Sequence, residues 1–375
     1  MKIRILSLIL TLLALAVLAG CSREGSSTGS LTGTHTVTDH LGVEVEVPYE
    51  INRIAVCDIY PVPSVLAVFF DSADKIVGMP EQSLNPAKAG LLGELYPELL
   101  NAETGYIQGT SVNTEELLKL APDVVFYSSG SPAIGEQLAA AGIPALAISA
   151  DNWGYDAIET LNHWIELFDE LFPNNGKSDA VRQYSEKVYA DVQKRVADVP
   201  EAERQKAFFL FQYSDTQIMT SGKNFFGQWW AESIGCVNVG QVLETNKSAP
   251  VDMEQIYAWD PTLIFITNYN AAKPADLAEN TVGSWDWSPV TAVQTGNVHK
   301  MPLGMYRSYT CGADTPVTLY WLAKTAYPAL FEDVDVIAET RAYYREVFGI
   351  ELTDAQAEKI FAPSAASLAV SPVES

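Results

Sequence analysis

One pattern of polar and apolar residues occurs twice along the chain. Each copy begins with Asn or Asp and carries Glu or Gln three positions later, and the copies start at Asn113 and at Asp252. A side-chain oxygen at the first position accepts from the third helical amide. The side chain of Glu116 or Gln255 returns a bond, so each copy predicts a helix opened by a capping box.

The same two copies continue in the same way. Pro122 in the first copy and Pro261 in the second prevent the helix from continuing. The apolar runs that follow, at 124–126 and 263–265, are typical of strands buried on both faces of a parallel sheet. The sequence therefore predicts two related α/β lobes.

The elements around these copies complete the two lobes. In the first lobe, strands are expected at 53–60, 75–79, 123–128 and 144–149, with helices at 64–70, 113–120 and 134–141. In the second, strands are expected at 207–213, 263–267 and 298–303, with helices at 226–233, 253–258 and 316–327. Alternation of strands and helices predicts a parallel, Rossmann-like sheet in each lobe.

A single helix is predicted between the lobes. Residues 178–199 contain neither Gly nor Pro, and apolar residues recur there at helical spacing. We expect an N-terminal lobe over 36–172, a linking helix over 173–199, a C-terminal lobe over 200–361 and a flexible tail over 362–375. A ligand cleft is expected between the lobes.

The composition excludes one large class of function. The chain has 23 Lys and Arg against 47 Asp and Glu, a net charge of −24, and no basic run that could follow a phosphate backbone. It therefore does not bind nucleic acid, and basic partners are expected. With 48% hydrophobic and 19% charged residues it is a globular protein, which we expect to be a monomer.

The N-terminus reads as an export signal. Lys2 and Arg4 precede an apolar run, 5–19, which is shorter than a membrane-spanning helix requires. The tetrapeptide ending at Cys21 resembles the bacterial lipobox. We therefore expect a signal peptide over 1–20, a lipidated Cys21 and a Ser/Gly/Thr-rich tether over 21–35, with attachment to the membrane through the lipid only.

Motifs for catalysis or metal binding are absent from the sequence. The triplet Gly176-Lys177-Ser178 lacks the glycine that a P-loop needs five positions earlier, where Leu171 stands. The four histidines are scattered, so neither a metal site nor a catalytic residue is predicted. Cys57 is expected to be a small buried residue, while a bridge between Cys236 and Cys311 stays open.

Aromatic and amide side chains follow many of the predicted strands. Ligands of open parallel sheets bind beyond the carboxyl ends of the strands, so these side chains are expected to line the cleft. The candidate ligand-binding residues are Tyr60, Tyr127, Trp153, Tyr213, Tyr269, Tyr306 and Arg307, with Tyr106 and Trp285 adding to the walls.

Arg307 is singled out among the arginines, because it alone follows a predicted strand at its carboxyl end. A guanidinium beside aromatic rings can hold a carboxylate or catecholate oxygen with two parallel hydrogen bonds. The alternative is an internal ion pair with Asp314.

Four longer segments connect the chain to a known family. They are Glu116-Leu-Leu-Lys-Leu-Ala-Pro-Asp-Val-Val, Ser221-Gly-Lys-Asn-Phe-Phe, Trp287-Ser-Pro-Val-Thr-Ala-Val-Gln-Thr-Gly-Asn-Val and Trp321-Leu-Ala-Lys-Thr-Ala-Tyr-Pro-Ala-Leu-Phe. In order and spacing, over 37–331, the chain resembles the substrate-binding lipoproteins of ABC importers for ferric siderophores, haem and cobalamin. Cys236 departs from this family, which commonly has glycine there.

The resemblance implies a function and its partners. It implies an extracytoplasmic protein that captures a metal chelate, a ferric siderophore first and haem or a corrinoid as the alternative, and delivers it to an ABC permease and its ATPase. It also implies a carboxylate on each lobe that docks on the permease, for which Glu136 and Glu232 are the candidates; the alternative is that both are solvated helix charges.

Two other functions stay open. One is a surface enzyme acting on a tetrapyrrole or peptide, and the other is a carrier or sensor lipoprotein without a transporter.

Overall fold

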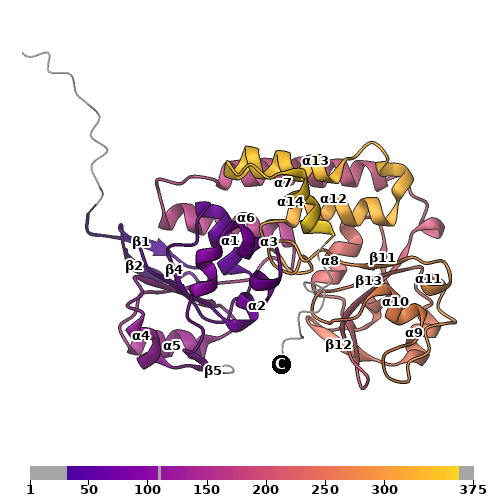
Figure 1. Cartoon of the computed structure of the whole chain (residues 1–375), viewed down its shortest axis with the longest axis horizontal. Coiled ribbons are helices and arrows are strands. Elements are labelled where there is room, and N and C mark those ends of the chain that lie inside the picture. The colour runs from indigo at the N-terminus through magenta and orange to yellow at the C-terminus, as the bar shows by residue number, and fades with distance from the viewer. Residues whose placement is uncertain (1–31, 109–110, 363–375) are drawn as a thin grey trace, which may run out of the picture.

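The protein consists of two α/β lobes joined across one side by a layer of helices (Figure 1). The computed structural model describes residues 32–108 and 111–362. The predicted signal peptide, the lipidation site Cys21 and the tail from residue 363 lie outside the described residues. The mixed α/β class with two lobes and parallel sheets is confirmed.

The N-terminal lobe is built on a four-stranded parallel sheet in the order β4-β3-β7-β8. Its strands are β3 (Ile54–Val56), β4 (Ile76–Gly78), β7 (Val124–Ser128) and β8 (Ala145–Ile148). Its helices are α1 (Val62–Phe70), α2 (Glu81–Ala89), α3 (Leu91–Leu95), α4 (Thr114–Lys119), α5 (Pro132–Ala140) and α6 (Ala157–Leu171). The hairpins β1 (Thr34–Thr38) with β2 (Glu44–Pro48), and β5 (Ile107–Gln108) with β6 (Ser111–Val112), flank the sheet.

The C-terminal lobe has a larger, mixed sheet. Its strands are β9 (Lys206–Tyr213), β10 (Ile218–Ser221), β11 (Val237–Asn238), β12 (Ser248–Val251), β13 (Leu263–Ile266) and β14 (Val298–Lys300). β9, β13 and β14 pair in parallel, as predicted. The sequence pattern did not reveal β11, which pairs with β9 in parallel, or β10 and β12, which add an antiparallel edge. The helices of this lobe are α8 (Phe226–Ser233), α9 (Met253–Trp259), α10 (Pro274–Ala278) and α11 (Thr291–Gln294).

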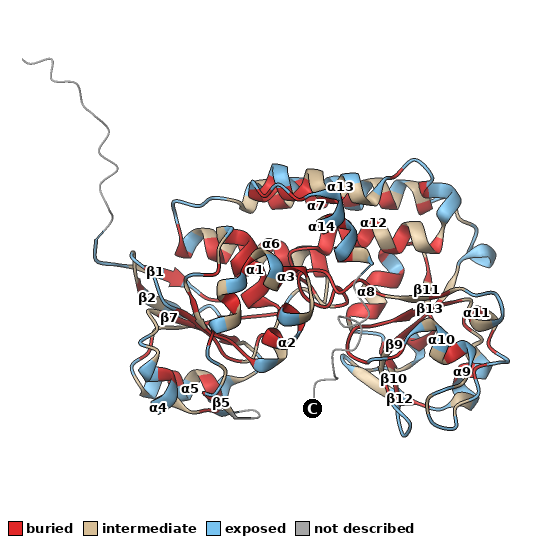
Figure 2. Cartoon of the chain, in the orientation of Figure 1, coloured by how far each residue is buried: buried red, intermediate tan, exposed pale blue. Residues whose placement is uncertain are grey.

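The linking helix is α7 (Ser178–Val196), which ends three residues before the predicted boundary. Its buried positions include the expected stripe of Val181, Tyr184, Val188, Val192 and Val196. α12 (Thr315–Ala326) and α13 (Val336–Tyr343) lie along it and complete the helical layer, whose inner face is buried (Figure 2). α13 continues into a π-helical turn (Tyr344–Phe348) and then α14 (Asp354–Phe361). Short 3₁₀ turns occur at Pro97–Asn101, Glu201–Glu203, Val239–Val242 and Pro328–Phe331.

The two predicted capping boxes have different outcomes. Asp252 accepts from the Gln255 amide and the Gln255 side chain accepts from the Asp252 amide, so the second box is complete. Asn113 caps α4 by accepting from two amides, but the Glu116 side chain accepts instead from Lys119. A nearby lysine on the exposed helix face competes for that carboxylate, so the first copy has only an N-cap.

The three described cysteines, Cys57, Cys236 and Cys311, are all buried free thiols. The bridge between Cys236 and Cys311 that the sequence left open is therefore not formed.

The complete capping box gives a prediction for stability. Asp252→Ala removes the acceptor of the Gln255 amide, which lies 2.8 Å from Asp252 Oδ1. We expect the free energy of unfolding, measured in urea, to fall by about 1 kcal/mol. Glu116→Ala, which removes only an exposed pair with Lys119, is the control and should change it by less than about 0.5 kcal/mol. Equal losses in the two variants would contradict the assignment.

Candidate functional site

Four of the predicted residues meet where the carboxyl ends of strands from both lobes face each other. Tyr60 follows β3 of the N-terminal lobe, Tyr269 follows β13, and Tyr306 and Arg307 follow β14. Tyr269 raises the pKa of Tyr60, and Tyr60 raises that of Tyr306, so these phenols from the two lobes lie near one another. The strand-end rule therefore predicted four residues that the structure brings together.

Arg307 is the centre of this cluster. Its side chain is only 1% exposed, and its guanidinium carbon lies 4.8 Å from the ring centre of Tyr269 and 5.7 Å from that of Tyr306. Its backbone has a φ of 22°, a region that residues other than glycine rarely adopt. Strained conformations of this kind are found most often at functional sites.

The sequence left open an ion pair between Asp314 and Arg307, but the contacts of Asp314 are with other groups. Its Oδ2 accepts from the Met305 amide at 2.6 Å, and its Oδ1 accepts from the Tyr344 hydroxyl at 2.6 Å. The carboxylate thus holds the backbone near Arg307 and a helix of the C-terminal segment.

The tyrosines around Arg307 remain protonated. Burial raises the pKa of Tyr269 and of Tyr306 above the usual tyrosine value, and the charge of Arg307 opposes this shift in both. Burial also raises the pKa of Tyr60, with the nearby Asp58 adding to the effect. Protonated phenols can donate hydrogen bonds to an acceptor in the cleft. Asp58 itself accepts from the Ser128 amide at 2.7 Å.

Lys300 supplies a second cation beside the cluster. Its Nζ donates to the carbonyl oxygens of Thr267 at 2.9 Å and Asn270 at 2.7 Å, so it ties β14 to the loop that carries Tyr269. Burial lowers the pKa of Lys300 to about 7; the charge of Asp276 opposes this shift, and that of Arg307 adds to it.

An aromatic floor connects Arg307 to an open groove between the lobes. Tyr269 packs on Phe211 at 4.9 Å between ring centres, Phe211 on Phe225 at 5.8 Å, and Phe225 on Tyr155 of the N-terminal lobe at 5.1 Å. The groove has a volume of about 590 Å³, and its polar lining includes Asp151, Lys223, Asn224, Gln228 and Asn246. It is therefore lined from both lobes.

Three of the sequence candidates lie inside a single lobe. Tyr106 is 2% exposed and donates to the Val56 carbonyl oxygen at 2.5 Å, beneath the N-terminal sheet. Tyr127 packs against Gly135 of α5, and the Tyr213 hydroxyl accepts from Trp287 Nε1 at 2.9 Å in the C-terminal core. Being near a strand end does not tell which face of the sheet a side chain takes.

Two further candidates are held by local contacts. Trp153 stacks on His163 at 4.2 Å and meets His40 edge-on, on the N-terminal lobe. Trp285 donates to the Ser214 carbonyl oxygen at 2.8 Å, at a turn of the C-terminal lobe. The structure does not bring either into the cluster around Arg307.

Sequence reasoning did not select Tyr155, Phe225 or Lys300. Phe225 stands in the Ser221-Gly-Lys-Asn-Phe-Phe segment that carries the family resemblance, so a signal for it was available. Lys300 lies within the predicted strand 298–303, and the early end of β14 brings it to the cleft. Tyr155 has no sequence signal.

The two candidate docking carboxylates lie in different settings. Glu136 is exposed on α5, at the end of the N-terminal lobe away from the helical layer (Figure 1). Glu232 is exposed on α8 and accepts from Gln228 Nε2 at 2.8 Å. The next residue, Ser233, accepts from Gln193 of α7, so α8 lies beside the helical layer.

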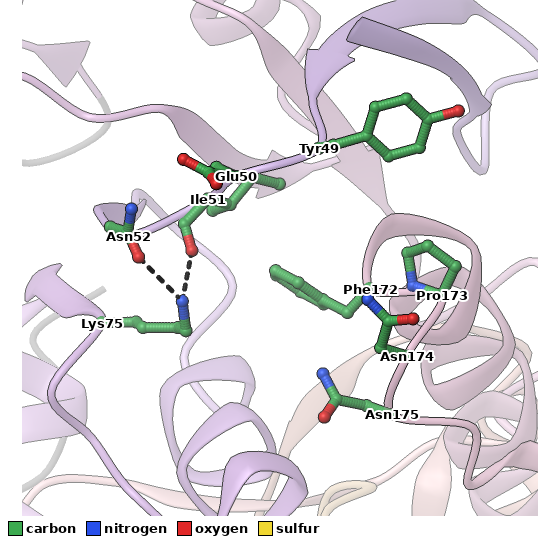
Figure 3. Close-up of a pocket in the computed structure, with 9 residues that line it drawn as sticks. All are labelled: Tyr49, Glu50, Ile51, Asn52, Lys75, Phe172, Pro173, Asn174 and Asn175. Carbon is green, nitrogen blue, oxygen red and sulfur yellow. Dashed lines mark hydrogen bonds between the residues drawn. The ribbon is translucent and has the colours of Figure 1, made fainter. Parts of the chain in front are cut away.

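A second cavity lies at the opposite edge of the N-terminal sheet (Figure 3). It has a volume of about 390 Å³ and is lined by residues 49–52, Lys75 and residues 172–175. Lys75 Nζ donates to the Ile51 carbonyl oxygen and to Asn52 Oδ1, and both neighbouring strands begin here. This cavity therefore lies at the amino ends of these strands. Ligands of parallel sheets bind beyond the carboxyl ends, so the cleft between the lobes is the better candidate for the binding site.

Within the described ranges, no group of three or more His, Cys, Asp or Glu could hold a metal ion. In the same part of the chain, no helix has both the length and the hydropathy to cross a membrane.

Two α/β lobes, a rigid helical connection and a strand-end cleft define a bilobal solute-binding protein. The family model described as "Periplasmic binding protein" matches residues 60–303, and the chain belongs to this family. It is a solute-binding protein of ABC transporters and acts outside the cytoplasm, and its relatives are transport binding proteins rather than enzymes.

Individual relatives agree with this assignment. The molybdate-binding protein MolA of Haemophilus influenzae is 26% identical over 339 residues, 83% of this chain and 90% of the relative. A periplasmic solute-binding protein of Veillonella parvula is 26% identical with a TM-score of 0.77, covering 88% of this chain and 97% of that structure. The structure of MolA with molybdate has a TM-score of 0.71 at 24% identity, covering 85% and 99%.

The position of Lys300 predicts a pH dependence of stability. A lysine in the unfolded chain has a pKa near 10.5, whereas Lys300 in the folded protein has one of about 7. Between these values the unfolded chain binds more protons, so the Lys300 contribution to stability rises with pH from 7 to 10.5 and is lowest below 7.

Lys300→Met removes this contribution. We expect the free energy of unfolding of the native protein, relative to the variant, to increase from pH 7 to 9 by at most about 1.4 kcal/mol per pH unit. Urea unfolding at pH 7, 8 and 9 measures it. Parallel pH profiles of the two proteins would contradict the shift.

Proposed function

We propose that the protein captures a small anionic solute in the interlobe cleft and delivers it to an ABC permease. The observation that supports this most strongly is Arg307, a guanidinium buried between two tyrosine rings at the carboxyl ends of the strands. A guanidinium in this setting presents paired donors to an oxyanion, and burial strengthens the attraction because water screens it less.

The cluster suits an anion in two further ways. The protonated hydroxyls of Tyr60 and Tyr306 are donors, and Lys300, whose pKa is about 7, adds positive charge nearby when it is protonated. The net charge of −24 is repulsive at long range, so these local cations carry the attraction.

The enclosure of Arg307 favours a small ligand. A side chain that is 1% exposed admits only a compact group unless the lobes separate. A tetrahedral oxyanion of the molybdate class meets this condition, and the relative named for molybdate binding supports it.

An iron chelate, specifically a ferric siderophore, is the second candidate. The groove of about 590 Å³ and its aromatic floor favour it, because they offer room and ring surfaces to a larger ligand whose anionic group reaches Arg307. A haem carboxylate could be held in the same way, whereas a neutral corrinoid would rely on stacking alone.

We further propose that the protein is a lipoprotein held to the membrane by Cys21, as the lipobox-like tetrapeptide indicates. A diacylated anchor suffices for stable attachment of an acidic protein that anionic lipid headgroups repel.

The internal repeat suggests how the protein docks on its permease. α5 follows β7 in the N-terminal lobe and α10 follows β13 in the C-terminal lobe, and each helix begins with proline. Glu136 lies four residues after Pro132 on α5, and an exposed carboxylate near the matching place in the C-terminal lobe is Glu279, five residues after Pro274 and just past the end of α10. We propose this pair, rather than Glu136 with Glu232 on α8, as the docking carboxylates, since α8 lies beside the helical layer.

The anion hypothesis predicts a loss of affinity on substitution of Arg307. The panel comprises molybdate, tungstate and a ferric tris-catecholate complex, titrated by calorimetry. For whichever of these binds, Arg307→Ala should weaken binding by about 2 to 5 kcal/mol. Arg307→Lys should restore little, because lysine lacks the paired donors.

The control is Arg53→Ala, which removes an arginine at the amino end of β3 whose Nε donates to the Leu120 carbonyl oxygen. It should leave affinity unchanged. An Arg307→Ala protein with native affinity for the bound anion, or a native protein that binds none of the panel, would refute this hypothesis.

The docking hypothesis predicts a transport defect without a binding defect. Charge reversal at Glu136 and Glu279 together should abolish solute import in cells, because both lobes then repel basic residues of the permease. Affinity for the solute should not change. Glu232→Lys should retain import; because Glu232 lines the groove between the lobes, solute affinity is measured for this variant too, and loss of import with native affinity would return the role to Glu232.

A further inference from the structure

The loop that carries Arg307 is unusual for its burial. Residues 301–314 connect β14 to α12 without helix or strand, and all except Thr310 are buried. Buried loops are rare because each backbone polar group needs a partner within the protein. The partners of this loop therefore determine where Arg307 lies.

A segment near the C-terminus provides several of these partners. We call α13, the π-helical turn and α14, residues 336–361, the C-terminal arm. Tyr343 donates to the Ala313 carbonyl oxygen at 2.9 Å and Tyr344 to Asp314 Oδ1 at 2.6 Å. The Ile360 carbonyl oxygen accepts from the Gly304 amide at 3.3 Å.

Asp314 passes this restraint to the vicinity of Arg307. Its second oxygen accepts from the amide of Met305, two residues before the arginine. Gly304 permits the close approach: its φ is +62°, and a Cβ there would lie 2.5 Å from Asp314 Oδ2. Tyr344, Asp314 and Met305 thus form a continuous chain from the arm to the strained backbone at Arg307.

The π-helical turn brings two consecutive tyrosines to this loop. Tyr343 and Tyr344 are both 0% exposed, and both hydroxyls reach the end of the loop. Consecutive residues of a regular α-helix point about 100° apart, so the wider turn helps to bury both. Single π-helical turns occur frequently at functional sites.

The far end of the arm contacts the other lobe. Lys359 on α14 forms an ion pair with Glu94 on α3. Gly90, which precedes α3, faces Leu303 of the loop so closely that a Cβ there would lie 2.9 Å from Leu303 Cδ2. The loop, the arm and the N-terminal lobe therefore meet at one junction.

We propose that the C-terminal arm is a positioning element for anion recognition, in which Tyr344, acting through Asp314, holds loop 301–314 so that Arg307 lies over Tyr269. This inference rests on the proposed function, since it assigns the arm a role in the binding at Arg307. Tyr344 is a positioning residue and does not itself contact the solute.

The test compares Tyr344→Phe with Tyr184→Phe. Both remove one hydroxyl from the helical layer, but Tyr184 on α7 bonds to Glu339 of α13 and not to the loop. Hydrogen exchange, followed by mass spectrometry without ligand, should become faster in peptides covering 301–314 for Tyr344→Phe only. Peptides covering β13 should exchange as in the native protein for both variants.

Binding of the panel anion gives the second readout. Tyr344→Phe should weaken affinity on the order of tenfold, mainly through faster dissociation, with little change in melting temperature. Asp314→Asn in the Tyr344→Phe background should add little, because the two residues act through one bond. Tyr184→Phe should retain native affinity.

The possible failures are distinguishable. Unchanged exchange of loop 301–314 in Tyr344→Phe overturns the arm hypothesis, whatever the ligand. A second outcome is that hydrogen exchange of the loop becomes faster in Tyr344→Phe while its affinity stays native, for an anion whose binding Arg307→Ala weakens. This outcome overturns the link between the arm and anion recognition. If Arg307→Ala itself leaves affinity unchanged, the proposed role of Arg307 fails and the link between arm and recognition fails with it.

Discussion

Burial of a cationic side chain at the meeting of two lobes is the constraint on which the cleft depends. Transferring a guanidinium out of water costs several kcal/mol unless its surroundings compensate. Around Arg307 the faces of Tyr269 and Tyr306 contribute to this compensation, because their π electrons attract the cation. A positive charge held at this place favours a solute of negative charge over a neutral one.

The same constraint accounts for the supporting structure. The half-buried Lys300 fixes the loop of Tyr269 by donating to two carbonyl oxygens. The loop of Arg307 is buried, strained at φ 22° and braced by Asp314 and the C-terminal arm. A flexible loop would let the guanidinium turn to solvent, and preorganisation would be lost. The helical layer joins the two lobes and holds them on either side of Arg307.

The sequence could predict those features whose signal comes from a few neighbouring residues. Helix caps and proline stops are local, so the repeat at Asn113 and Asp252 located both lobes. The position of Arg307 after β14 followed from the strand-end rule. The direction of a side chain depends on distant contacts: Tyr127 and Tyr213 stand near strand ends but turn into their own lobes. The C-terminal arm was also missed, because its contacts with loop 301–314 join segments whose pairing leaves no periodic pattern.

The family and the fold leave the solute open, because chemistry is decided by a few side chains on a shared framework. We propose that the side chains around Arg307 select a solute of negative charge. Native mass spectrometry of the protein purified from its source, with elemental analysis of the released solute, tests it most directly. We expect a bound species of net negative charge, an oxyanion or an anionic chelate. A neutral or cationic solute retained in the cleft would contradict it.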